Sequence, residues 1–280
     1  MNHILTLTCP DRPGIVHAVC SGLLDVGGNI VENAQFSEPI TGTFCMRLAC
    51  ETAEHDPVVV RDAVLARLAD PAAQVTVRAE STRPRVLIMV SKFDHCLVDL
   101  LYRWRTGALP IDIPVIVSNH PDCALVAATH GIPYVHLPIT ASTKASQEAQ
   151  LKALIERHEI DLVVLARYMQ VLSDDLCAHL SGRAINIHHS FLPGFKGAKP
   201  YHQAHERGVK LVGATAHFVT ADLDEGPIIE QDVARVNHAH TVEQLVSLGQ
   251  DTERAVLSRA VRYWAEDRVL LVGNTTVVFT

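Results

Sequence analysis

The chain has 280 residues, of which 48% are hydrophobic and 20% are charged, and this composition is typical of globular proteins and not of disordered or fibrous ones. Its 24 basic and 31 acidic residues give a formal net charge of −7, which argues against a broad nucleic-acid interface because such surfaces are basic. The longest apolar runs, such as residues 86–90, are far shorter than the roughly 18 residues of a membrane helix. We therefore predict a globular α/β protein of about two domains, with no membrane or nucleic-acid partner.

The N-terminus and the cysteines indicate the cellular compartment. The first residues lack the basic, apolar and small-residue regions of a secretory signal peptide. The seven cysteines are odd in number and scattered, and they form no C-x-x-C motif, so neither a disulfide framework nor a zinc knuckle is predicted. These features favour a reducing compartment, and we expect the protein to be cytoplasmic.

A polar stretch that ends at Pro84 separates two segments with different hydrophobic periodicity. We predict a first domain at residues 1–80, a linker at residues 81–84 and a second domain at residues 85–280. In the first domain, helices are predicted to begin near Ile15 and Val58, and strands are predicted near residues 4–8, 30–37, 43–50 and 74–79. The resulting order, βαββαβ, is the ferredoxin-like arrangement.

The second domain begins with a continuous apolar strand at residues 85–90, after which predicted strands and helices alternate. Such strands are typical of a mainly parallel sheet covered on both faces, so a Rossmann-like domain is predicted. Residues 211–219 and 227–236 are predicted to form a hairpin-like extension. The capping-box sequence Thr241-Val242-Glu243-Gln244 then predicts the start of a long helix.

Candidate catalytic side chains lie at the carboxyl end of one predicted strand and in a later acidic loop. Asn186 and His188 are two residues apart, so their side chains lie on the same face of a strand, and the loop holds Asp222, Asp224 and Glu225. An amide can donate to an oxyanion, an imidazole can transfer a proton, and a carboxylate can orient the imidazole or a water, so these residue types suit acyl transfer. By residue type alone, a structural histidine and an Asx turn remain alternatives.

The blocks N-I-H-x-S-x-L-P, starting at Asn186, and H-F-V-T-x-x-L-D-x-G-P, starting at His217, resemble the folate-dependent formyltransferase family. This resemblance covers about residues 85–280 and implies the fold of that family. It also implies that Asn186, His188 and Asp224 are catalytic. Our hypothesis for the mechanism is that Asp224 orients and helps to deprotonate a water, Asn186 donates to the oxyanion, and His188 supports the oxyanion and delivers a proton to N10.

The same resemblance implies a pterin site built largely from backbone groups of two loops, since main-chain donors and acceptors suit the edge of a flat heterocycle. His95 is a candidate for positioning water or closing the pocket. Lys196 is a candidate for binding the glutamate carboxylates of folate, and a solvated basic loop is the alternative. The predicted substrate contacts are Met169, Gln170, Leu172, Leu223, Glu225, Gly226, His95 and Lys196.

The loop after the first strand of the second domain distinguishes among members of the family. Glycinamide ribonucleotide formyltransferases carry a glycine- and serine-rich turn there, which holds the phosphate of the amine substrate, whereas this chain has Ser91-Lys92-Phe93-Asp94-His95-Cys96, without glycine and with an added acid. This loop, residues 188–198 and the N-terminal domain together make the chain similar to the formyltetrahydrofolate deformylases.

The N-terminal domain resembles an ACT domain through the sequence L-T-C-P-D-R-P-G-I, which ends at Ile15, and the later sequence G-G-N-I. This resemblance implies pairing into a homodimer or homotetramer, and binding of an amino-acid effector such as glycine or methionine. A pairing scaffold without a ligand is the alternative. The implied effector contacts are Asp11, Arg12, Gly14, Ile15, Gly28 and Asn29.

These features predict an enzyme that hydrolyses 10-formyltetrahydrofolate to formate and tetrahydrofolate, which supplies formate for purine synthesis and balances the one-carbon pools. The sixteen histidines are dispersed and form no H-E-x-x-H motif, so we expect neither a metal nor a cofactor. Two alternatives remain: a formyltransferase with an amine acceptor, and an amino-acid sensor with an idle catalytic domain.

Overall fold

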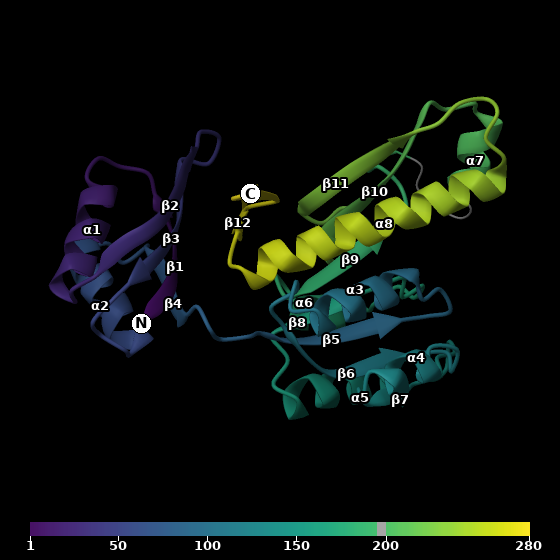
Figure 1. Ribbon diagram of the computed structural model, residues 1–280, viewed down its shortest axis with the longest axis horizontal. Coiled ribbons are helices and arrows are strands. Elements are labelled where there is room, and N and C mark those ends of the chain that lie inside the picture. The colour runs from purple at the N-terminus through teal and green to yellow at the C-terminus, as the bar shows by residue number, and fades with distance from the viewer. Residues whose placement is uncertain (195–199) are drawn as a thin grey trace. The chain divides into compact units, whose positions relative to one another are not determined.

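The computed structural model describes residues 1–194 and 200–280, and these residues form two compact units (Figure 1). The N-terminal unit comprises Met1–Thr82 together with Glu266–Thr280, and the central unit comprises Arg83–Ala265. The chain passes from one unit to the other between Thr82 and Arg83. This boundary lies inside the stretch that the sequence predicted as a linker.

The N-terminal unit is built on a four-stranded antiparallel sheet with the strand order β2-β3-β1-β4. Because side chains alternate along a strand, Leu5 and Leu7 of β1 point to the same face, where they share one apolar core with Val19 of α1 and Val60 of α2. The element order matches the predicted βαββαβ arrangement. The elements are β1 (Asn2–Pro10), α1 (Ile15–Asp25), β2 (Asn29–Glu38), β3 (Thr43–Glu51), α2 (Pro57–Leu68) and β4 (Gln74–Ala79).

The last part of the chain returns to the N-terminal unit. Its antiparallel strands are β12 (Val269–Val272) and β13 (Thr275–Val278). Leu270 packs against Cys45 of β3, and Arg47 Nε donates to the Glu266 carbonyl oxygen at 2.9 Å. The central unit therefore ends at Ala265, and not at residue 280 as we predicted. The prediction failed because local periodicity does not reveal which distant face a hairpin covers.

The central unit contains a seven-stranded sheet with the order β11-β10-β9-β8-β5-β6-β7. The five strands from β9 to β7 are parallel, whereas β10 is antiparallel to β9 and to β11, as the predicted hairpin-like extension requires. The elements are β5 (Arg85–Val90), α3 (His95–Arg105), β6 (Asp112–Ser118), α4 (Ala124–Thr129), β7 (Tyr134–His136), α5 (Lys144–Arg157), β8 (Leu162–Leu165), α6 (Asp174–His179), β9 (Ala184–His188), α7 (Pro200–Glu206), β10 (Leu211–Phe218), β11 (Ile228–Arg235) and α8 (Val242–Ala265).

Helix α8 begins with the predicted capping box and lies across β9, β10 and β11 (Figure 1). The Thr241 amide donates to Gln244 Oε1 at 2.8 Å, and the Gln244 amide donates to Thr241 Oγ1 at 3.3 Å. This reciprocal pair satisfies two of the amides that the start of a helix leaves free. Among the described residues, no helix combines the length and the apolar character needed to cross a membrane.

The parallel strands bring their carboxyl ends to one edge of the sheet, where the loops after β5, β8 and β9 meet. The buried Ser91 joins two of these loops. Its Oγ donates to Asn119 Oδ1 at 2.7 Å and accepts from the Met169 amide at 3.0 Å. The loop after β8 is therefore held in a defined position beside the loop after β5.

Candidate active site

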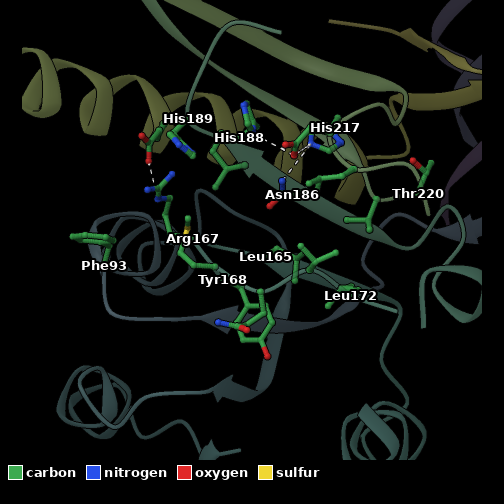
Figure 2. Close-up of a pocket in the computed structure, with 18 of the residues that line it drawn as sticks. Phe93, Leu165, Arg167, Tyr168, Leu172, Asn186, His188, His189, His217 and Thr220 are labelled. Carbon is green, nitrogen blue, oxygen red and sulfur yellow. Dashed lines mark hydrogen bonds and ion pairs between the residues drawn. The ribbon is translucent and has the colours of Figure 1, made fainter. Parts of the chain in front are cut away.

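A cavity of about 560 Å³ lies at this edge of the sheet (Figure 2). A volume of this size falls within the range of ligand pockets, which is roughly 300–1,000 Å³. Its walls come from the loops after β5, β8 and β9, from the loop between β10 and β11, and from α7 and α8. The lining residues include Phe93, His95, Leu165, Arg167, Tyr168, Met169, Gln170, Leu172, Asn186, His188, His189, Tyr201, His217, Thr220, Leu223, Asp224 and Glu253.

The three predicted catalytic residues all line this cavity. Asn186 and His188 lie on the same face of β9, as their spacing predicted. His188 Nδ1 lies 3.2 Å from Asp224 Oδ1, which is the geometry of an N–H that donates to a carboxylate. His188 Nε2 is buried and has no hydrogen-bond partner among the described residues. The geometry therefore leaves one imidazole nitrogen free for a ligand.

Asp224 is held in the loop between β10 and β11 with a left-handed backbone, at φ 57°. The hydrogen bond from His188, and then the His217 ring, whose Nε2 lies 3.7 Å from Asp224 Oδ1, keep the pKa of Asp224 well below its ordinary value, although burial opposes them. Gly226 allows this loop its close turn, because a Cβ there would lie 1.8 Å from the Phe218 carbonyl oxygen. The cavity thus contains a carboxylate that stays ionised at neutral pH.

His217 is a fourth polar residue of this group, and the sequence analysis assigned it no role. The antiparallel register places His217 of β10 opposite Asn186 of β9, where its Nε2 lies 3.3 Å from Asn186 Nδ2 (Figure 2). Its Nδ1 lies 2.9 Å from the Phe218 carbonyl oxygen, so Nδ1–H donates there and the Nε2 of the neutral ring accepts from Asn186. His217 therefore orients the Asn186 amide.

A second polar group, to which Arg167 belongs, lies across the cavity from Asn186 and His217 (Figure 2). The Glu253 side chain is only 1% exposed, and its oxygens lie 2.8 Å from His95 Nε2 and 3.3 Å from Arg167 Nε. The Tyr201 hydroxyl donates to the same carboxylate at 2.7 Å. Buried charges need such partners, and here one carboxylate is shared by three side chains.

Sequence reasoning missed this second group, apart from His95. Glu253 had a detectable signal: it falls at helical spacing between Gly249 and Val256, on the buried face of α8, where a carboxylate is unexpected without partners. Gly249 makes room for the contact, since a Cβ there would lie 2.0 Å from the Tyr201 hydroxyl. The partner of Glu253 could not be read from the sequence, because Arg167 belongs to a different loop.

Among the described residues, one group brings three metal-type ligands together, namely His95, Cys96 and Glu253, whose ligand atoms lie within 4.8 Å of one another. Burial and the nearby Glu253 charge raise the pKa of the Cys96 thiol well above its ordinary value. Glu253 is already engaged by the Arg167 guanidinium. A protonated thiol and a neighbouring cation suit an ion-pair network better than a metal site.

The predicted substrate contacts fall into three classes. Five of them line the cavity: His95, Met169, Gln170, Leu172 and Leu223. Glu225 is exposed and Gly226 is buried against Phe218, and neither is among the described residues that line the cavity. Lys196 lies outside the described residues.

The predicted effector contacts surround the start of α1. Asp11 and Asn29 are exposed, whereas Ile15 is buried in the core. Gly14 has a φ of 92°, and Gly28 packs against the Leu23 carbonyl oxygen. Arg12 Nη2 donates to the Leu68 carbonyl oxygen at 2.7 Å, so its guanidinium binds the end of α2.

Known proteins resemble the chain over different fractions of its length. A family model described as formyl transferase matches residues 84–261. Glycinamide ribonucleotide transformylase 1 from Symbiobacterium toebii, at 31% identity and a TM-score of 0.67, covers 71% of this chain and 95% of its own.

Two relatives match over essentially the whole length. A formyltetrahydrofolate deformylase from Corynebacterium sp. (strain P-1) is 49% identical over 99% of this chain and 98% of its own. The crystal structure of a formyltetrahydrofolate deformylase from Burkholderia mallei ATCC 23344 is 52% identical, with a TM-score of 0.94, over 100% of this chain and 99% of its own. Because these relatives match both units at 49% and 52% identity, the chain belongs to the formyltetrahydrofolate deformylase family.

Proposed function

We propose that this protein hydrolyses 10-formyltetrahydrofolate to formate and tetrahydrofolate. The observation that carries the proposal is the meeting of Asn186, His188 and Asp224 in one cavity of about 560 Å³. They supply an amide donor, an imidazole with a free nitrogen and an ionised carboxylate. These groups can carry out the hydrolysis of an N-formyl bond without a metal or a cofactor, so the proposal includes neither.

In this proposal His188 performs the proton transfer. Because its Nδ1–H donates to Asp224, the neutral ring has its lone pair on the unpartnered Nε2. Nε2 takes a proton from water as the water oxygen attacks the formyl carbon, and it returns that proton to N10 as the C–N bond breaks. Asp224 has a depressed pKa and is a weak base, so we assign it the tasks of fixing the His188 tautomer and stabilising the imidazolium.

Asn186 stabilises the oxyanion of the tetrahedral intermediate. One hydrogen of its amide donates to His217 Nε2, which fixes the side chain and leaves the second hydrogen free. A donor that is oriented before the reaction needs no reorganisation when charge develops on the formyl oxygen. We therefore assign His217 the role of a positioning residue for Asn186.

The pterin ring occupies the part of the cavity between the loop after β8 and the acidic loop. Apolar side chains from both loops line this part, among them Leu172 and Leu223. A flat heterocycle can stack between such walls while backbone groups near Met169 and Thr220 bind its edge. In this arrangement the formyl group of N10 lies toward Asn186.

The two alternatives are less well supported. An amine-using transferase would share the same three residues, but the relatives that match the whole chain are named deformylases. An amino-acid sensor with an idle catalytic domain would have no need for the Asp224–His188 contact or the unpartnered His188 Nε2.

An amine-free assay tests the proposal. The purified protein is mixed with 10-formyltetrahydrofolate in an amine-free buffer, and formate and tetrahydrofolate are measured together. We expect equal amounts of both products, and we expect Asp224→Asn to lower their release by about 10²–10⁴-fold. Turnover that requires an added amine would contradict the proposal, and so would amino-acid binding without any folate turnover.

For the N-terminal unit we propose an ACT-like role in pairing and regulation. Its βαββαβ order and antiparallel sheet support the assignment. Among the described residues no side chain caps the start of α1, so backbone amides there are available to an amino-acid carboxylate. Because Arg12 binds the end of α2, we assign it to the turn and not to the ligand.

Glycine or methionine is expected to bind this unit and to change the rate of formate release. Equilibrium dialysis with each amino acid, followed by the amine-free assay at saturating concentration, checks both effects, and alanine serves as the control. Absence of binding and of any rate change with glycine and methionine would leave only a pairing role.

The proposal places the enzyme in the cytoplasm as a homodimer or homotetramer. Free cysteines, including the exposed Cys20, are compatible with a reducing compartment. There, formate released by the enzyme would supply purine synthesis, and tetrahydrofolate would return to the one-carbon pool.

A further inference from the structure

Arg167 has a backbone conformation that arginine rarely adopts. Its φ of 64° lies in the left-handed region, where glycine has no strain but a side chain does. The backbone is fixed on both sides, since the Ser91 amide donates to the Arg167 carbonyl oxygen at 3.3 Å and the Ala166 amide donates to Met89 at 2.8 Å. This strained conformation places a guanidinium in the cavity. Strained residues are common at functional sites, so a function for this side chain is expected.

The guanidinium is only partly satisfied in its position. The Arg167 side chain is 10% exposed, its Nε faces Glu253 at 3.3 Å, and its Cζ lies 5.8 Å from the centre of the Phe93 ring. The Glu253 carboxylate is shared with His95 and Tyr201. Arg167 Nη1 is buried and finds no hydrogen-bond partner among the described residues. A buried donor of this kind requires an acceptor from a ligand or from water.

Water and an amine differ in their ability to satisfy this donor. Water has two lone pairs, so it can accept from Nη1 with one and attack with the other, whereas the attacking amine nitrogen has a single lone pair and its ammonium form has none. The permanent charge of Arg167 also opposes a second cation nearby. Burial and the Arg167 charge together hold the pKa of His189 at about 4, which is consistent with that effect.

Arg167 also lies beside the loop that follows β5. Phe93, which it contacts, and His95, which shares its carboxylate partner, both belong to the loop or helix start that follows β5. In the family that the chain resembles, amine-using formyltransferases carry their phosphate-binding turn at this place. The arginine, the glutamate and these two side chains therefore lie together at the place that the resemblance assigns to the phosphate of an amine acceptor.

We propose that Arg167, held by Glu253, is the specificity-determining residue that reserves the formyl group for water and excludes amine acceptors. This inference rests on the proposed hydrolysis and adds its acceptor specificity. It predicts that removing the guanidinium allows the enzyme to transfer the formyl group to an amine. In that reaction a primary amine nitrogen attacks the formyl carbon, the bond to N10 breaks, the amine loses one proton and N10 gains one.

The test measures how the formyl group partitions between water and glycinamide, a small primary amine. Arg167→Gly combined with Glu253→Gln removes the side chain, relieves the backbone strain and leaves no unpaired buried carboxylate. We expect the ratio of N-formylglycinamide to formate to rise at least about tenfold over the wild type, the scale at which pocket contacts discriminate between substrates. Arg167→Lys keeps the charge and serves as the matched control, with the wild-type ratio expected.

Arg167→Met combined with Glu253→Gln provides a second variant, which keeps most of the volume but removes the charge. We expect a smaller rise in the ratio for this variant, and circular dichroism checks that both variants are folded. The inference is overturned if both folded variants keep the wild-type ratio. It is also overturned if they lose all turnover with water and with amine, because Arg167 would then belong to the hydrolytic machinery. Formate release by the wild type without amine, measured in the same series, tests the proposed hydrolysis separately.

Discussion

Asp224→Asn is expected to lower the turnover number by about 10²–10⁴-fold, the range of general acid–base catalysis. The asparagine amide can donate to His188 Nδ1, which then becomes an acceptor and moves the proton of the neutral ring to Nε2. That tautomer cannot take a proton from water. The loss should therefore appear in kcat, with little change in KM, in steady-state assays of formate release.

Asp222→Asn is the matched control for this experiment. Asp222 lies in the same loop and is exposed, and its backbone oxygen, not its side chain, accepts from Thr220 Oγ1 at 3.0 Å. We expect its turnover number to equal that of the wild type. A large loss with Asp222→Asn, or an unchanged rate with Asp224→Asn, would remove Asp224 from the mechanism.

The pH dependence of stability gives Asp224→Asn a second readout. The folded pKa of Asp224 lies well below the ordinary value of 3.8, because His188 and His217 stabilise the carboxylate. A depressed pKa contributes stability above the unfolded pKa, and this contribution is lost as the pH falls through the folded pKa. The wild type should therefore have the higher melting temperature near neutral pH, and its advantage over Asp224→Asn should shrink as the pH falls below about 4.

Asn186→Ala is expected to reduce the turnover number by about 10²–10³-fold, the usual cost of losing one oriented oxyanion donor. The affinity for tetrahydrofolate should change little, because the pterin contacts come from other loops. Steady-state kinetics gives the turnover number, and fluorescence titration with tetrahydrofolate gives the affinity.

Asn186→Asp separates the effect of losing the hydrogen-bond donor from the effect of losing side-chain volume. Aspartate has nearly the same shape as asparagine but cannot donate when ionised, so we expect a loss at least as large as that of the alanine variant. A nearly active aspartate variant would contradict the oxyanion role. Weak folate binding with an unchanged turnover number in Asn186→Ala would assign the residue to binding instead.

The local features of the active site followed from the sequence. The two-residue period of a strand placed Asn186 and His188 on one face of β9, and the structure confirms that placement. The capping box at Thr241 marked the start of α8, and the continuous apolar strands indicated a mainly parallel sheet, as observed. These features depend on neighbouring residues, so the local order of the chain is enough to predict them.

The hairpin β12–β13 shows where such reasoning fails. Residues 266–280 follow α8 directly in the chain, and we assigned them to the same domain as that helix. In the structure Leu270 covers Cys45 of the N-terminal sheet, and Arg268 Nη1 lies 3.1 Å from Glu32. The destination of the hairpin depends on which apolar face is left to cover, and that face is formed by residues far away in the sequence.

The sequence by itself determined the order of the elements, the family and the three residues that we assign to the chemistry. Only the tertiary structure decided which groups face them: the register of β9 and β10 set His217 opposite Asn186, and the packing of α8 set Glu253 against Arg167. Periodicity and capping act over a few residues, whereas strand register and buried ion pairs arise only when distant segments pack together. For that reason the residues that we propose as catalytic could be identified from motifs, but the charged group across the cavity could not.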